Sequence, residues 1–282
     1  MLNDYPSTNS AHTPVIRCGG RGAQHASATA EAAPAAVVRL DLRTFLDEAH
    51  YAIKLRDYGG GYAEIGYSFV PALRKACVAR GTSENRDKNE KRACNRASSK
   101  IRHLVLASGA DHLLTLTYRE NITDLAQAEE DLERFVRLVK ASYPDWRYIA
   151  VPEKQTRGAW HWHLAVCGWQ DIGCVRAAWR HCVGEGNIDV QPPKGPREKR
   201  RFALVRYLTK YLVKGFQEGH ELNRHRYRRS QKIEDPVVSL SLPASARVDV
   251  VGFVIRKLCE VAGGVGHQWQ SEDQTAGWAC SW

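Results

Sequence analysis

Two histidines stand one residue apart in the apolar run "GAWHWHLAV". Side chains on a strand alternate between its two faces, so His161 and His163 share one face and Trp162 points to the other. Glu153 lies on the preceding predicted strand, across the turn "KQTRG". In a hairpin, two imidazole nitrogens and one carboxylate oxygen can hold a divalent cation and leave positions open for water or a phosphate oxygen. The pattern predicts a catalytic metal site; the alternative is a histidine pair that binds nothing.

A second pattern, "RYLTKYLVK", follows about forty residues later. Tyr207 and Tyr211 are four residues apart and therefore share one face of a helix, with Lys210 and Lys214 three residues beyond each of them. A phenol with a pKa of about 10 is a weak nucleophile, but a nearby ammonium favours the phenolate and a cation withdraws charge from a phosphate. Tyrosine, lysine and metal together predict transesterification of a phosphodiester. The alternative is an amphipathic helix with packed tyrosines and solvated lysines.

The chain is basic, with 41 Lys and Arg against 31 Asp and Glu, a net charge of +10. Its isoelectric point of about 9.3 favours a polyanionic partner. Residues 194–232 hold 13 Lys or Arg against three Glu, a surplus equal to that of the whole chain. This basic segment surrounds the tyrosines, and the alternative to DNA binding is a solvated basic tail. The predicted DNA contacts are Lys154, Arg157, Arg200, Arg201, Arg206, Arg226, Arg228 and Arg229.

A membrane location finds no support in the sequence. No stretch approaches 18 uncharged apolar residues, and the N-terminus lacks the basic and apolar segments of a secretory signal. We therefore expect a cytoplasmic protein without a membrane partner. The eight cysteines form no CxxC pair, which argues against a zinc ribbon or a disulfide framework.

Hydrophobic periodicity predicts alternating strands and helices from residue 112 onwards. The expected strands are 112–119, 146–153, 159–167 and a short strand around "NIDVQPP"; the expected helices are 123–141, 171–183 and 201–216. The order β-α-β-β-α-β-α predicts an α+β fold, with a mostly antiparallel sheet and helices on one face.

Composition divides the rest of the chain. Residues 1–36 are rich in Ala, Ser, Thr, Gly and Pro and are expected to be a poorly ordered leader. Residues 37–108 are expected to be a helical region of unknown role, residues 109–235 carry the motifs, and residues 236–282 are a C-terminal extension.

The segments "LLTLTYR", "EKQTRGAWHWHLAV" and "YLTKYLVK", in this order, resemble the three motifs of HUH endonucleases, in particular the two-tyrosine rolling-circle replication initiators of phages and plasmids. His161 and His163 match the His-hydrophobic-His motif, and Glu153 matches the carboxylate that completes the metal site. Tyr211 with Lys214 matches the tyrosine motif. The second tyrosine, Tyr207, and the interleaved Lys210 match the two-tyrosine variant, and Leu114–Tyr118 match the first motif.

The resemblance implies that residues 109–235 form a ferredoxin-like HUH nuclease domain that works with Mg²⁺ or Mn²⁺. The implied activity is site-specific nicking and rejoining of single-stranded DNA at a replication origin through a 5′-phosphotyrosine, with a host helicase and polymerase as partners. The sequence has no GxxxxGK[ST] motif and therefore no recognisable fused helicase motor. Two alternatives stay open: a non-catalytic DNA-binding regulator, and a single-strand transposase of the same superfamily, which usually needs only one tyrosine.

Overall fold

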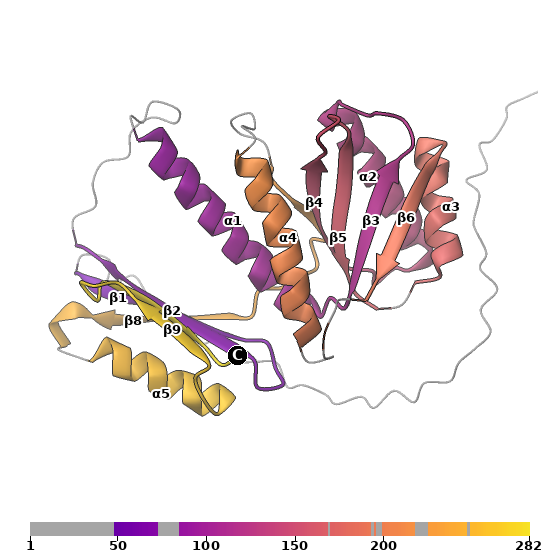
Figure 1. The fold of residues 1–282 in the computed structure, drawn as a ribbon. Coiled ribbons are helices and arrows are strands. Elements are labelled where there is room, and N and C mark those ends of the chain that lie inside the picture. The colour runs from indigo at the N-terminus through magenta and orange to yellow at the C-terminus, as the bar shows by residue number, and fades with distance from the viewer. Residues whose placement is uncertain are drawn as a thin grey trace, which may run out of the picture.

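The computed structural model describes residues 48–72, 85–168, 170–192, 195, 199–217, 225–246 and 249–282. The expected leader, residues 1–36, lies outside these residues. The described chain forms two five-stranded sheets and five α-helices (Figure 1). The α+β class expected from the sequence is confirmed. No helix in the described part of the chain combines the length and the apolar character needed to cross a bilayer.

The central sheet has the order β6-β3-β5-β4-β7, and all its pairs are antiparallel. Its first four strands and their two connecting helices follow the β-α-β-β-α-β order of a ferredoxin-like fold, as expected. The elements are β3 (His112–Tyr118), α2 (Leu125–Ser142), β4 (Tyr148–Lys154), β5 (Trp160–Val166), α3 (Ile172–Val183), β6 (Gly186–Gln191) and β7 (Arg228–Arg229).

Helices cover both faces of the central sheet, whereas the sequence analysis placed them on one. Helices α2 and α3 pack on one face through Phe135 and Trp179. Helices α1 (Arg86–Ser108) and α4 (Arg200–Gln217) pack on the other through Leu104 and Leu208. The cause is visible in the strands themselves: every residue of β5 and the first five residues of β4 are buried, so neither face can be left in water.

A second sheet joins the two ends of the described chain. Its order is β8-β1-β2-β10-β9, again antiparallel throughout. Residues 50–70 were expected to be helical and form a β-hairpin instead, because their apolar side chains alternate and pack against α5. Residues 236–282 supply the rest of the sheet. The elements are β1 (His50–Asp57), β2 (Ala63–Val70), β8 (Val237–Pro243), α5 (Val250–Ala262), β9 (His267–Gln270) and β10 (Ala276–Cys280).

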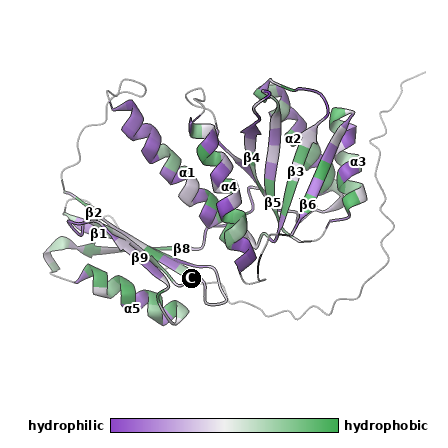
Figure 2. Cartoon of the chain, in the orientation of Figure 1, coloured by the Kyte–Doolittle hydropathy of each residue, from purple (hydrophilic) through white to green (hydrophobic). Residues whose placement is uncertain are grey.

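Helix α5 covers one face of this second sheet. Ile53, Ile65 and Tyr67 point toward Val254 and Leu258 of the helix and form a separate apolar core. In Figure 2 most of α5 is green and hydrophobic, while the N-terminal half of α1 is largely purple and hydrophilic.

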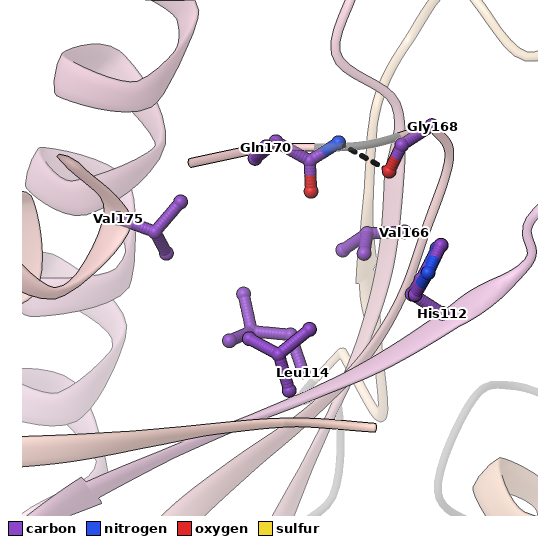
Figure 3. Close-up of a pocket in the computed structure, with 7 residues that line it drawn as sticks. His112, Leu114, Val166, Gly168, Gln170 and Val175 are labelled. Carbon is purple, nitrogen blue, oxygen red and sulfur yellow. Dashed lines mark hydrogen bonds between the residues drawn. The ribbon is translucent and has the colours of Figure 1, made fainter. Parts of the chain in front are cut away.

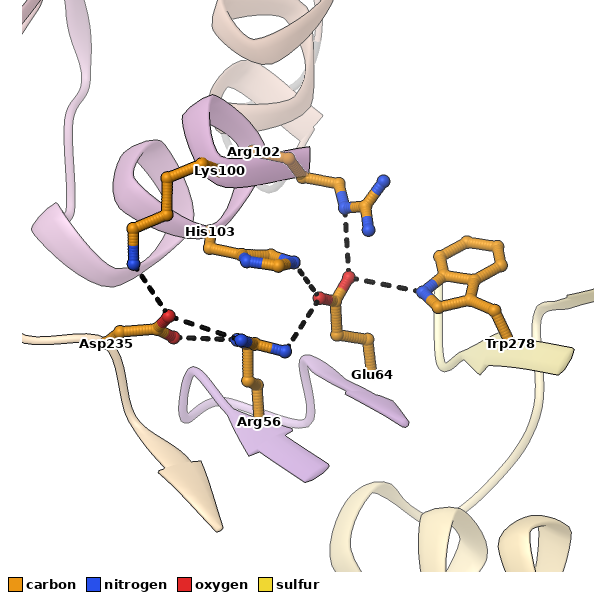
Figure 4. A network of polar contacts seen from close by, with 7 residues as sticks. All are labelled: Arg56, Glu64, Lys100, Arg102, His103, Asp235 and Trp278. Carbon is orange, nitrogen blue, oxygen red and sulfur yellow. Dashed lines mark hydrogen bonds and ion pairs between the residues drawn. The ribbon is translucent and has the colours of Figure 1, made fainter. Parts of the chain in front are cut away.

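The opposite face of the second sheet meets α1 through charged groups rather than through an apolar core. Glu64, which is 2% exposed, accepts a hydrogen bond from Arg102 Nε at 3.0 Å, and its carboxylate lies 2.6 Å from His103 Nε2 (Figure 4). Asp235 binds Arg56 at 2.7 Å and Lys100 at 2.9 Å. Burial alone would raise the pKa of Glu64, but these hydrogen bonds and positive charges lower it to about 2. The carboxylate is therefore ionised and links α1 to the second sheet.

Candidate active site

Strand β5 presents both predicted histidines to α4. His161 and His163 are 7% and 4% exposed, and they lie on the sheet face that α4 covers. Trp162 points the other way and donates its indole N–H to the carbonyl of Ala128 in α2 at 3.1 Å. The alternation predicted from "HWH" is confirmed.

Glu153 lies on β4 directly opposite His161 in the strand register, but its carboxylate reaches His163. His163 Nε2 is 2.7 Å from Glu153 Oε2, and Lys214 Nζ donates to Glu153 Oε1 at 2.8 Å. Burial would raise the pKa of Glu153, but the hydrogen bonds from His163 and Lys214 outweigh it and hold the pKa below the ordinary 4.5. Glu153 is therefore an ionised carboxylate at neutral pH.

His161 is held from one side only. The Gln155 amide nitrogen lies 3.1 Å from His161 Nδ1, whereas His161 Nε2 is buried without a hydrogen-bond partner in the described part of the chain. Burial, followed by the charges of His163 and Arg157, lowers the pKa of His161 to about 4, so the imidazole is neutral at pH 7. An unpartnered buried ring nitrogen is costly unless something binds it. A cation bound to Nε2 requires the ring proton to be on Nδ1. The Gln155 amide must then be turned so that its oxygen accepts a hydrogen bond from Nδ1–H.

The two tyrosines lie against the second histidine. The Tyr211 ring stacks on His163 with centroids 3.9 Å apart and planes at 14°, and Tyr207 meets the same imidazole edge-on at 5.5 Å. The Tyr211 hydroxyl donates to the Tyr207 oxygen at 3.2 Å. Burial raises the pKa of Tyr207 above its ordinary 10, which keeps that phenol protonated. The helical spacing thus brings both hydroxyls to the histidine strand.

The two lysines of α4 take different places. Lys214 binds Glu153 and the carbonyl of Lys154, the latter at 3.1 Å. Lys210 is exposed, and its ammonium lies 5.6 Å from the centre of the Tyr211 ring. The geometry therefore places the charge of Lys210 beside the Tyr211 phenol, while Lys214 neutralises the carboxylate.

Residues 111–216 match the model of a family of replication-associated proteins, described as the ORF2 type. This match supports a role in DNA replication. It begins at β3 and ends in α4, and it includes all seven residues predicted for metal binding and catalysis. Searches of curated proteins and of solved structures returned no match. The second sheet lies outside the matched residues.

The predicted metal site is present only in part. In the described part of the chain, no three His, Cys, Asp or Glu side chains are arranged so that they could hold a metal ion. His163 and Glu153 touch each other, and the Lys214 ammonium occupies the remaining carboxylate oxygen. The donor types and the unpartnered His161 Nε2 fit a divalent cation, while the ion pair with Lys214 competes with one.

The predicted DNA-binding residues fall into two groups. Lys154 and Arg157 flank the β4–β5 turn, and Arg200, Arg201 and Arg206 lie on the first turns of α4. In this first group Arg157 also donates to Gln155, and Arg201 lies over the Tyr62 ring. The remaining three lie C-terminal to α4 and are all held by contacts within the protein. Arg228 forms an ion pair with Glu129 at 2.7 Å, Arg226 packs over the Phe216 ring at 4.4 Å, and Arg229 donates to the carbonyls of Ser230 and Ile233.

Sequence reasoning missed two neighbours of the histidines. Thr115 Oγ1 lies 3.4 Å from His163 Nδ1, and Gln155 contacts His161. Thr115 could have been found, because it shares its strand face with Leu113 and Thr117 in the expected alternation. Gln155 could not, because its position depends on the conformation of the turn.

A hollow at the far end of the sheet is unrelated to this site. Figure 3 shows it between β3, β5 and α3, lined mainly by Leu114, Val166 and Val175, with Gln170 donating to the carbonyl of Gly168 at 2.7 Å. Its volume of about 10 Å³ suffices for one water molecule. We assign no ligand to it.

Proposed function

We propose that this protein initiates rolling-circle replication by nicking and rejoining single-stranded DNA through a 5′-phosphotyrosine. The observation that carries the proposal is the stacking of Tyr211 on His163, whose Nε2 contacts the Glu153 carboxylate. A phenol, an imidazole and a carboxylate meet at one point of a basic protein, within a region that matches a replication-associated family.

In the proposed first step the Tyr211 oxygen attacks the scissile phosphorus. The bond from phosphorus to the 3′-oxygen breaks, the bond to the Tyr211 oxygen forms, and the 3′-oxygen leaves as a hydroxyl after gaining a proton. The phenol proton passes to solvent, which supplies the proton on the 3′-oxygen, and the Lys210 ammonium, 5.6 Å from the centre of the Tyr211 ring, adds positive charge beside the attacking group. The 3′-hydroxyl is then available to a polymerase, and the phosphotyrosine ester keeps the bond energy for rejoining.

A Mg²⁺ or Mn²⁺ ion would be held by His161, His163 and Glu153. When bound, it would supply positive charge that stabilises the phosphate during attack. Lys214 supports the same carboxylate in the structure and would have to yield one oxygen to the ion. The sequence and the donor types do not choose between the two metals.

Tyr207 is the proposed second nucleophile, which closes the displaced strand into a circle. Its pKa, raised by burial, supports this order, because a phenol that stays protonated is the weaker nucleophile, and the Tyr207 oxygen is engaged by the Tyr211 hydroxyl while Tyr211 is a phenol. Once Tyr211 is esterified, that hydrogen bond is lost and Tyr207 is released. The proposed partners are origin DNA, a host helicase and a host polymerase.

Incubation with a labelled single-stranded circular DNA and Mn²⁺ tests the proposal. We expect a protein–DNA band that survives SDS, and Tyr211→Phe should reduce it by at least about 100-fold, since the nucleophile is removed. Tyr207→Phe, the matched control, should retain the first adduct. A wild-type protein that binds DNA but forms no adduct with either ion would instead indicate a non-catalytic regulator, and loss of the first adduct in Tyr207→Phe alone would reverse the order of the tyrosines.

A further inference from the structure

The second sheet presents a row of side chains on the face opposite α5. Lys54, Gly66, Trp278 and Trp269 are directly paired across β1, β2, β10 and β9. Residues paired in this way point to the same face. Trp278 binds Glu64 on the α1 side, so the whole row lies on that side (Figure 4).

Part of this row is open to solvent. Trp269 on the edge strand β9 is 60% exposed, the highest value among the large hydrophobic residues of the described chain, and Lys54 and Ser68 are exposed further along the same face, on β1 and β2. Gly66 has no side chain to rise above the sheet. The atom nearest to the position that a Cβ would take there is the Gly277 carbonyl oxygen, 3.5 Å away. The row is therefore a flat surface with an indole at its edge, and an exposed tryptophan is unusual without a partner.

A series of ring contacts joins this row to the tyrosine helix. Trp278 lies 6.4 Å from Trp282, and Trp282 lies 5.0 Å from Phe202 in the first turn of α4. Phe202 also lies 5.4 Å from Tyr62 at the tip of the β1–β2 hairpin. Phe202 precedes Tyr207 by five residues, or roughly 8 Å along a helix. A strand leaving the candidate site toward the start of α4 would reach these rings.

The charges along this path suit a polyanion. The Arg201 guanidinium lies 4.9 Å from the centre of the Tyr62 ring, and that of Arg102 lies 5.2 Å from the centre of the Trp278 ring. Glu64, the carboxylate beneath Trp278, is paired with Arg102 at 3.0 Å and is buried, so it does not face the proposed path as a free negative charge. Aromatic faces interleaved with Arg and Lys bind unpaired bases and their phosphates without regard to sequence.

We infer that the row of Lys54, Trp278 and Trp269 is a platform on which bases of single-stranded DNA stack after leaving the tyrosine site. The inference deepens the proposed function, because it rests on single-stranded DNA being the substrate. It gives the second sheet, which lies outside the matched family region, a role in holding the strand on one side of the cut.

Binding of two fluorescein-labelled single-stranded oligonucleotides to the full chain tests the inference. One oligonucleotide is long enough to run from α4 onto the second sheet, and the other covers the tyrosine site alone. We expect Trp269→Ala to weaken binding of the long oligonucleotide by about tenfold, in line with the loss of one stacked base, and to leave the short one unchanged. Trp269→Phe should restore most of the affinity. The matched control is Val261→Ala, which truncates an exposed apolar residue of α5.

Equal affinity of Trp269→Ala and wild type for the long oligonucleotide would overturn the inference. So would a dimer that Trp269→Ala converts to a monomer in light scattering with DNA affinity unchanged, because the indole would then serve contact between copies of the chain. The SDS-resistant adduct is scored separately. Length-dependent binding that needs Trp269 supports the platform even if no adduct forms, and an adduct with no Trp269 effect supports the nuclease without the platform.

Discussion

The imidazole of His163 contacts the Glu153 carboxylate, the Thr115 hydroxyl and both tyrosine rings, whereas Gln155 is the one hydrogen-bond partner of the His161 imidazole among the described residues. The two histidines thus share a motif but not an environment. His163 organises the side chains around it, and His161 keeps one ring nitrogen without a partner. The proposed metal-binding role would account for the second arrangement, since a buried imidazole nitrogen with nothing to bind is otherwise a cost.

Alanine substitutions should separate these roles. His163→Ala leaves a cavity beneath Tyr211 and removes a partner from Glu153, so the free energy of unfolding should fall by about 2–3 kcal/mol. His161→Ala also removes a buried ring, but it breaks only the Gln155 contact and relieves the unpartnered Nε2, so it should cost less, about 1 kcal/mol. Both variants should lose the Mn²⁺-dependent adduct. Urea unfolding together with adduct formation measures both effects; equal destabilisation by the two substitutions would contradict this division.

At the scale of elements, α1 is held between two different surfaces. Toward α4 and the central sheet it presents Ile101, Leu104 and Val105, an apolar contact. Toward the second sheet it presents Lys100, Arg102 and His103, which bind buried or half-buried carboxylates. The contact with the second sheet depends on the ionisation of its carboxylates, whereas the apolar contact with α4 and the central sheet does not.

This difference predicts a pH dependence. The pKa of Glu64 is lowered from 4.5 to about 2 by folding, so its contribution is fully present above pH 4.5 and is lost as pH falls toward 2. Glu64→Gln should lower the free energy of unfolding at pH 7 by about 3 kcal/mol and flatten its pH dependence in this window. The control Glu260→Gln disrupts an exposed pair with Lys257 and should cost under about 1 kcal/mol. Urea unfolding between pH 2 and pH 7 measures both variants against the wild type. If the free energy of unfolding of Glu64→Gln fell between pH 4.5 and pH 2 as steeply as that of the wild type, the prediction would be wrong.

The elements of the central sheet were predictable because their signals are local. The period of α2 and the alternation in "HWH" depend on neighbours in sequence, and the structure has them within a few residues of the expected bounds. Helices on both faces could have been foreseen from the unbroken apolar run "YIAV" in β4. The β1–β2 hairpin has a local signal in its alternation, but the sheet around it could not be foreseen, because its partners β8 and β10 lie far along the chain. For the same reason, the contact of Glu153 with His163 rather than with His161 depends on tertiary detail.

At the scale of the whole molecule, the excess positive charge is not all available to DNA. Arg228 is paired with Glu129 and Arg226 is folded over Phe216, so part of the basic segment serves the fold. Arg200, Arg201 and Arg206 lie on α4 on the approach to Tyr207. The phosphate contacts should therefore concentrate at the start of α4 and at the β4–β5 turn.

Salt dependence distinguishes the two groups. Arg206 is exposed, and Arg206→Ala should reduce the slope of log affinity against log salt by about 0.7, the value for one phosphate contact to a single strand. Arg228→Ala should leave the slope unchanged, because its guanidinium is already paired. Fluorescence anisotropy from about 50 mM to about 300 mM salt, on variants with wild-type circular dichroism, measures this difference. A reduced slope in Arg228→Ala would place that residue on DNA.

The late completion of the second sheet has a consequence for biosynthesis. Strand β2 is joined to the end of β10 by contacts such as Ala63 N–H to Ser281 Oγ, made between residues 218 positions apart. While a ribosome is still translating the tyrosine helix, the hairpin of residues 50–70 has emerged without the strands that flank it. Its backbone edges stay unsatisfied until β8 and β10 follow, so a chaperone that shields extended segments would act on this protein early.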